Sequence, residues 1–188
     1  MARKRLVMLI SGAICALVVS ACGAGEHART ADNLGTGYVQ LGALNYQVQI
    51  SRQLNPWDPN EDHWYFQGFS HSQLALPKSD EYFGVSLQVY NWTNRAARPT
   101  TDFYISDSLG DRFEPMRNPT PNPYTFVPQL IPAGGQLPNR SSAAFSGWSQ
   151  GEFLVFKVPY ADLVNRPFTL HIVSPSAPSR QSRIELDV

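Results

Sequence analysis

The chain has 188 residues and a formal net charge of zero, with 15 basic and 15 acidic residues. This length suits one well-buried domain and leaves too little chain for two. Beyond residue 5 the sequence contains no run of lysine or arginine, which argues against nucleic acid as a partner.

The first 22 residues have the plan of a secretory signal. Arg3, Lys4 and Arg5 form a basic start, and the apolar stretch that follows, 6–19, is shorter than the roughly 20 residues of a membrane-spanning helix. Two small residues then precede Cys22. We therefore expect residues 1–21 to be a signal peptide that is removed.

The residues "VSAC" at 19–22 resemble the lipobox of bacterial lipoproteins. The resemblance implies lipidation of Cys22 by a diacylglycerol group and an acyl chain such as palmitate. Two or more chains would hold the protein stably in the cell membrane, on its extracytoplasmic side. A plain signal peptide with a chance cysteine is the alternative. Cys15 lies in the discarded segment, so we expect no disulfide within the mature chain and no cofactor besides this covalent lipid.

Residues 22–36 comprise the lipidated cysteine and a small, polar stretch that predicts a flexible tether. From 37 to 188 the dominant period is two, which is typical of strands with one buried face. In the first strand Leu44, Tyr46, Val48 and Ile50 are expected to face the core. The predicted strands are 44–51, 82–91, 102–106, 152–159, 168–173 and 183–188, with two weaker candidates at 124–130 and 141–148.

Helical patterns are confined to one turn at 160–165. Strands without helices to cover them must bury their apolar faces against each other. Residues 37–188 are therefore predicted to form an all-β domain, an immunoglobulin-like antiparallel β-sandwich of about seven to nine strands.

One stretch, 82–115, combines a strand ending in Asn91, a second strand, a turn with Asp107 and Gly110, and Phe113. This pattern resembles small immunoglobulin-like domains of bacterial envelope lipoproteins, the group that includes the DUF4352-type and MPT63-like domains. The resemblance covers about 37–188. It implies a fold and an envelope location, and it implies no common activity.

The sequence "GWSQG" at 147–151 satisfies the G-x-S-x-G pattern of serine hydrolases, and Asp162 and His171 follow in their chain order. That motif requires a helix after the serine, whereas Ser149 leads directly into a predicted strand. His171 alternates with apolar neighbours and is expected to face water. We therefore predict no catalytic residues and no enzyme, and an envelope esterase using Ser149 is the alternative.

A second motif, "DPNEDH" at 58–63, has the opening spacing of a calcium loop. His63 and Phe69 occupy the positions where an EF-hand needs glycine and glutamate, so the EF-hand fails. A looser calcium site with Asp58 and Asp62 stays open, and with it a calcium-dependent adhesion module.

Five aromatic residues crowd the same region: Trp57, Trp64, Tyr65, Phe66 and Phe69. Aromatic rings backed by polar groups suit recognition of a protein or a glycan, and they also cap hydrophobic cores. The sequence thus predicts a membrane-anchored extracytoplasmic lipoprotein that acts as a non-enzymatic binding or assembly module of the cell envelope. Its partner, an envelope protein or glycan, is not named by the sequence.

Overall fold

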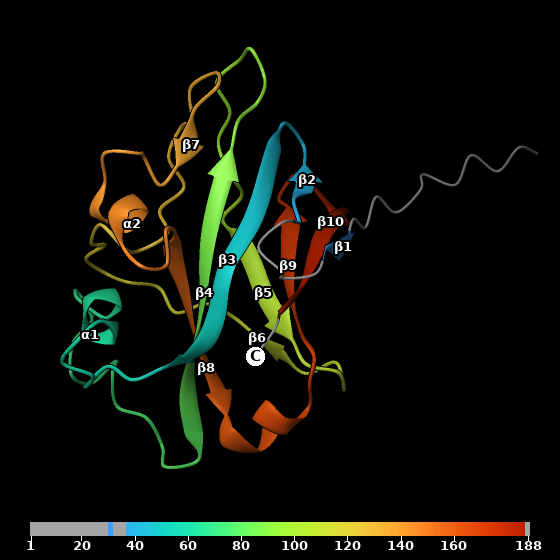
Figure 1. Ribbon diagram of the computed structural model, residues 1–188. Helices are drawn as coiled ribbons and strands as arrows, with labels where there is room; N and C mark the ends of the chain where they lie inside the picture. The colour runs from blue at the N-terminus through green and yellow to red at the C-terminus, as the bar shows by residue number, and fades with distance from the viewer. Residues whose placement is uncertain (1–29, 32–36, 187–188) are drawn as a thin grey trace, which may run out of the picture.

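The computed structural model describes residues 30–31 and 37–186, which fold as a sandwich of two sheets (Figure 1). Sheet A has the strand order β1-β10-β9-β5-β6, and sheet B has the order β2-β3-β4-β7, with β8 also paired to β4. The strands are β1 (Thr30–Ala31), β2 (Val39–Leu41), β3 (Leu44–Leu54), β4 (Asp80–Tyr90), β5 (Asp102–Ser106), β6 (Arg112–Phe113), β7 (Gln136–Leu137), β8 (Glu152–Pro159), β9 (Phe168–Ser174) and β10 (Ala177–Leu186). Every pairing between them is antiparallel except that of β1 with β10.

The predicted all-β antiparallel sandwich is confirmed. The six stronger strand predictions correspond to β3, β4, β5, β8, β9 and β10. The described helices are short: α1 (Asp62–Tyr65), α2 (Ala143–Ser146) and the 3-10 helix η1 (Tyr160–Val164), which lies at the single predicted turn. Among the described residues no helix is long and apolar enough to cross a membrane.

The main core lies between the two sheets. Alternate residues of β4, from Phe83 to Val89, are fully buried there against Leu170 and Ile172 of β9. The opposite layer of this strand is also buried, which the one-faced pattern did not predict. Tyr82 packs in a second cluster with Leu54 of β3 and with Phe153 and Val155 of β8.

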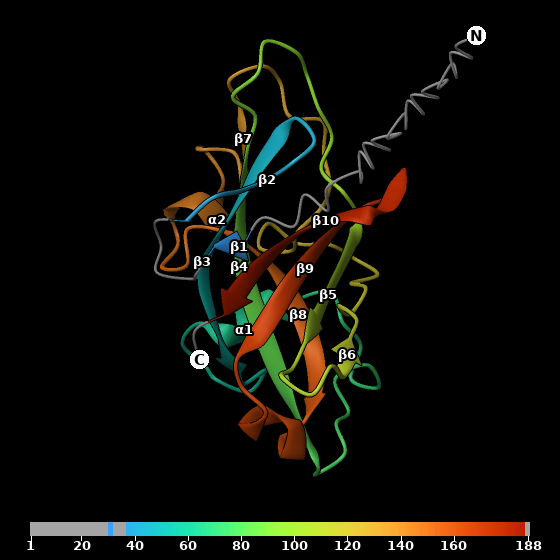
Figure 2. The same ribbon diagram turned by 90° about the vertical axis from the view of Figure 1, so that its right-hand side faces the viewer.

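This second cluster covers the outer face of sheet B. Segments distant in sequence cover this cluster: the insert, defined as residues 55–79 between β3 and β4, and the stretch that contributes Met116 and Tyr124. Figure 1 shows α1 and α2 on one side of the sandwich, with β9 and β10 on the other, and Figure 2 shows β9, β10 and β5 toward the viewer. Among the described segments, loops therefore overlie the outer face of sheet B and leave that of sheet A uncovered.

Three details of the strand prediction are wrong. A β-bulge between Val48 and Ile50 shifts the register against β4, so Ile50 is 38 % exposed and Ser51 is buried in its place. Residues 141–148 contain α2, because the Ser142 hydroxyl caps the turn by accepting the Phe145 N–H at 3.3 Å. In 124–130 only Thr125 makes a bridge, to Phe153, and Pro128 has no N–H to extend it.

The predicted signal peptide, Cys22 and most of the predicted tether lie outside the described residues. Within 22–36 the structure describes only Thr30–Ala31, which pair as β1 with Arg183 and Ile184.

Candidate functional site

All four tryptophans of the chain are exposed. Trp57 exposes 65 % of its surface, Trp64 42 %, Trp92 60 % and Trp148 94 %, whereas the described core is filled by phenylalanine, tyrosine and aliphatic side chains. All four belong to the outer side of sheet B or to the segments that cover it, as the contacts below show. We call these four residues the tryptophan face.

The insert is held in place by its own aromatic residues. Tyr65 and Phe66 are each 3 % exposed, and Phe69 packs against the same second cluster. The ring of Phe66 meets that of Tyr82 edge-on, with centroids 4.8 Å apart. Three of the five predicted recognition residues therefore anchor the loop on sheet B.

The other two, Trp57 and Trp64, face outward beside histidines. Trp57 stacks with His71 at a centroid distance of 6.1 Å, and Trp64 lies 4.3 Å from the ring of His63. His63 Nδ1 is in turn 3.2 Å from the Asp58 carbonyl oxygen. The predicted recognition loop thus divides into a buried anchor and an exposed aromatic surface.

Trp148 is presented by a turn that closes over β4. The Ser86 hydroxyl donates to the Ser149 carbonyl at 3.1 Å, and Gln88 Nε2 donates to the Gln150 carbonyl. A Cβ at Gly151 would lie 2.3 Å from Ser86 Oγ, so this close approach requires glycine. The turn is fixed by buried polar contacts while its tryptophan lies in solvent.

Trp92 belongs to a third aromatic group that the sequence analysis missed. Its ring centroid is 5.1 Å from that of Tyr38 and 5.7 Å from that of Tyr90, and Tyr38 and Tyr90 are 5.5 Å apart. Burial and the neighbouring Tyr38 raise the pKa of Tyr90 to about 12, which keeps its hydroxyl protonated. The sequence feature that could have predicted this group is the series of glutamines at outward-facing strand positions 40, 47 and 88.

Ser149, Asp162 and His171 are not brought together. Ser149 is buried in the layer over sheet B, whereas His171 alternates with core residues of β9 and so lies on the outer face of sheet A. The expectation that His171 faces water is wrong, because its ring stacks on Tyr104 at 4.1 Å and contacts the Ser106 hydroxyl at 2.9 Å. Burial lowers the pKa of His171.

The two candidate calcium ligands have other partners. Asp62 Oδ1 accepts from Arg52 at 2.5 Å, and Asp62 Oδ2 accepts from the Asn55 N–H at 2.7 Å. Asp58 Oδ1 accepts from the backbone and side chain of Asn60 at 2.9 and 3.0 Å. These bonds shape the start of α1.

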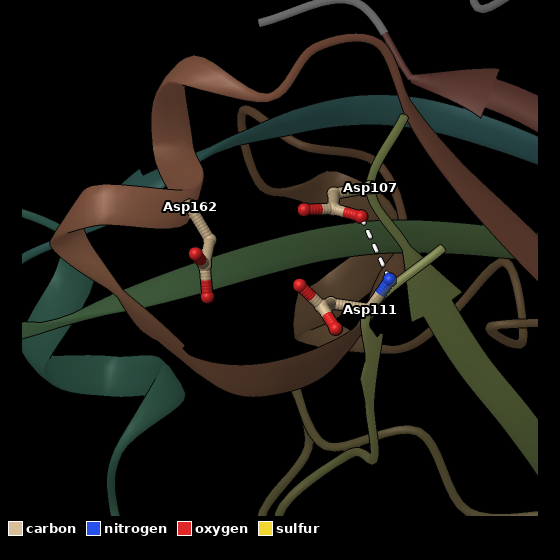
Figure 3. Close-up of side chains that lie close together, drawn as sticks. All are labelled: Asp107, Asp111 and Asp162. Atoms are coloured by element: carbon tan, nitrogen blue, oxygen red, sulfur yellow. Dashed lines mark hydrogen bonds between the residues drawn. The ribbon is translucent and has the colours of Figure 1, made fainter. Parts of the chain in front are cut away.

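A different acidic group lies at the end of the sandwich where η1 meets the β5–β6 turn. Carboxylate oxygens of Asp107, Asp111 and Asp162 lie within 4.8 Å of one another (Figure 3). Asp107 Oδ1 accepts from the Asp111 N–H at 2.8 Å, and its Oδ2 accepts from Asn165 Nδ2 at 3.0 Å. Asp107 therefore closes the turn and ties it to η1.

A cavity of about 920 Å³ opens where β5 meets the proline-rich stretch 115–128. Phe103, Phe126 and Leu154 contribute to its lining. The stretch itself follows the edge of β8, because Met116 N–H donates to the Val155 carbonyl at 2.7 Å and Phe126 N–H donates to the Phe153 carbonyl at 3.1 Å. Its backbone thus protects this edge from pairing with other chains.

No protein-family model matches the chain, and no curated protein matches it. The yjhA protein of Bacillus subtilis is 11 % identical over 81 % of this chain and 97 % of its own, with a TM-score of 0.47. A proposed lipoprotein of the same organism, ycdA, is 10 % identical over 80 % of this chain and 38 % of its own, with a TM-score of 0.48. An uncharacterised β-sandwich protein of Clostridium difficile is 7 % identical over 85 % of this chain and 96 % of its own, with a TM-score of 0.43. The resemblance to DUF4352-type and MPT63-like domains stays a prediction.

Proposed function

We propose that this protein is a lipid-anchored, extracytoplasmic binding module of the cell envelope that acts without catalysis, through the outer side of sheet B. The observation that carries this proposal is the tryptophan face: every tryptophan of the chain is exposed, and all four lie on one side. Tryptophan is highly buried on average in monomeric proteins and enriched in binding surfaces.

The way these side chains are held supports binding. Trp57 and Trp64 project from a loop fixed by Tyr65 and Phe66, and Trp148 projects from a turn fixed by Ser86. Rigid backing lowers the conformational entropy that a surface loses when a partner binds. Tryptophan adds a large contact area with only two rotatable side-chain bonds. The layer over sheet B is thus a rigid support that presents indole rings.

The anchoring part of the proposal comes from the sequence. The lipobox-like residues at 19–22 place the acylated Cys22 shortly before the domain. An anchor of two or three acyl chains is effectively permanent and needs no spanning helix. A binding domain held in this way would meet its partners at or near the extracytoplasmic surface of the membrane that holds it.

The absence of catalysis is proposed because the one hydrolase-like motif is not assembled. Ser149 and His171 lie on opposite outer faces of the sandwich, with the core between them. His171 also has its ring nitrogens in contact with Ser106 Oγ and Gln181 Oε1, at 2.9 and 3.1 Å. The motif therefore supplies a turn for Trp148.

Photo-cross-linking in living cells tests the proposal. A photoreactive amino acid placed at position 64 or 148 should capture one recurring set of envelope components. The same probe at the exposed Glu185, which pairs with Thr169 on the outer face of sheet A, should not. Equal capture from both faces, or capture of membrane lipid alone, would contradict it. Metabolic labelling with palmitate should mark the wild-type protein and fail in Cys22→Ser, while labelling that survives this substitution would exclude the anchor.

A further inference from the structure

We infer that the upper end of sheet B, around Tyr38, Tyr90 and Trp92, is a binding site for an uncharged oligosaccharide. The inference rests on the proposed function and names a ligand class for one part of the face. The site is separate from the insert, since it is built on β2, β3, β4 and β7.

The strand register places three amide side chains and Tyr90 in one row on the outer face of the sheet. Gln40 pairs with Asn45, Asn45 with Tyr90, and Tyr90 with Gln136, so these four residues form one rung across four strands. Directly paired residues point to the same side of an antiparallel sheet, and the neighbouring rung of Val39, Tyr46, Val89 and Leu137 faces the core. With strands about 4.8 Å apart, the rung is roughly 14 Å long, enough for a short oligosaccharide.

A second pair of amides supports the aromatic group from below. Gln47 and Gln88 pair across β3 and β4 and are 5 % and 4 % exposed. The Tyr90 hydroxyl donates to Gln88 Oε1 and lies 3.4 Å from Gln47 Oε1. Buried amides thus fix the central ring of the group, which is how a preorganised site is built.

The rings themselves remain accessible. Trp92 is 60 % exposed and Tyr38 44 %, and both rings contact the more buried Tyr90 of β4. Their planes are inclined to each other by 63°, so the pair forms a corner and not a flat shelf. An aromatic face of this kind can contact the apolar C–H face of a sugar ring, while amides beside it meet the hydroxyls.

The chemistry of the rung favours uncharged polyols over other partners. An amide side chain both donates and accepts hydrogen bonds, as a sugar hydroxyl does. None of the four residues of the rung is charged, so the rung offers no cation to a polyanion. None is aliphatic, so it offers no apolar surface to a helix. Arg140 lies at the rim, where its Nε donates to Gln136 Oε1 at 3.0 Å and so orients that amide.

The test is calorimetric titration of the purified full chain with oligomers of β-1,4-glucan, mannan and chitin. We expect at least one of these neutral probes to bind. Trp92→Ala should weaken that binding by roughly tenfold or more, and Gln136→Ala should weaken it to a smaller extent. Tyr160→Ala is the matched control, because this aromatic side chain is 63 % exposed, lies in η1 beyond the opposite end of β4, and should leave the affinity unchanged.

Three results would overturn the inference: no binding of any of the three oligomers, binding only of the polyanion polygalacturonate, or equal weakening by Trp92→Ala and Tyr160→Ala. Phosphatidylglycerol vesicles are titrated in parallel, and binding to vesicles alone would reassign the corner of Tyr38 and Trp92 to membrane contact. If glycans fail while cross-linking from position 148 still captures an envelope protein, only the ligand class is wrong and the proposed function stands.

Discussion

The ring of Tyr65 lies on the ring of Phe153, with their centroids 3.9 Å apart and their planes inclined by 30°. Tyr65 ends α1 in the insert and Phe153 belongs to β8, so this contact joins a long loop to the sheet beneath it. Both rings are 3 % exposed. The exposed tryptophans of the insert depend on this stack for their position.

Tyr65→Ala should therefore destabilise the whole domain. Removing a buried aromatic ring typically costs about 3 kcal/mol or more, because the vacated space is only partly refilled. Urea unfolding of the variant should show this loss as a lower midpoint. Trp57→Ala, in the same loop but 65 % exposed, should change the free energy of unfolding by less than about 0.5 kcal/mol. A small loss of unfolding free energy in Tyr65→Ala would mean that the insert is not anchored by this stack.

Gly84 gives a second test of the layer over sheet B. A Cβ at this position would lie 2.4 Å from Leu54 Cδ1 and 3.0 Å from Phe153 Cδ1. Gly84→Ala should cost about 1–3 kcal/mol through overpacking. Leu54→Ala removes the side chain with which that Cβ would collide. The double variant should therefore lose roughly 1 kcal/mol less unfolding free energy than the two single variants together. Purely additive losses would show that the two residues do not compete for space.

The Arg52–Asp62 pair provides a third prediction, on stability. The Asp62 side chain is 4 % exposed and that of Arg52 33 %, with Nη2 and Oδ1 2.5 Å apart. Arg52→Met should leave the buried carboxylate with only the Asn55 N–H, at a cost of about 1–3 kcal/mol. Glu114→Gln is the control, since it breaks an ion pair between Arg112 and Glu114 whose side chains are 51 % and 59 % exposed. Equal effects of the two variants would contradict the importance of burial.

The same geometry predicts how the protein responds to calcium. Both carboxylate oxygens of Asp62 already accept hydrogen bonds, so millimolar calcium should leave the melting temperature of the wild type unchanged relative to a chelator. A calcium-dependent rise that disappears in the double variant Asp58→Asn with Asp62→Asn would restore the calcium site at this turn. A rise that disappears only in Asp107→Asn would locate the ion at the other acidic group.

The sandwich could be predicted from the sequence because its core strands alternate strictly. Phe83, Val85, Leu87 and Val89 face the core as their period indicates. The burial of Tyr82 on the opposite face could not be predicted, since it depends on Phe66, which returns from the insert to cover it. A period describes one strand and carries no information about which distant loop lies on its other face.

Local departures from regular geometry account for the other errors. The bulge after Val48 moves Ile50 to the surface, and nothing in the alternation of residues 44–51 marks it. The Trp92 group was missed for a different reason. Tyr38 directly precedes β2, whereas Tyr90 ends β4 and Trp92 follows it, so the three become neighbours only through the register of β2, β3 and β4. In hindsight Gln40, at an outward position, was a usable signal.

Glu152 is a buried acid whose titration should be visible in the stability of the protein. It is 6 % exposed at the start of β8 and is paired with Leu87, and only the Val127 N–H approaches its carboxylate, at 3.4 Å. Burial raises the pKa of Glu152 to about 7 from its ordinary 4.5. Between these two values the folded protein retains a proton that the unfolded chain has lost. The free energy of unfolding should therefore decrease as pH rises through this range.

Glu152→Gln removes that titration and keeps the shape of the side chain. At about 1.4 kcal/mol for each pKa unit, the variant should be more stable than the wild type by up to roughly 3 kcal/mol near pH 8 and nearly equal to it near pH 4.5. Melting temperatures of both proteins across this range measure the difference. Burial also lowers the pKa of His171, so protonation of this residue destabilises both proteins equally as pH falls below 6.5. That contribution cancels when the two proteins are compared. A difference that does not vary with pH would show that Glu152 titrates as an ordinary surface acid.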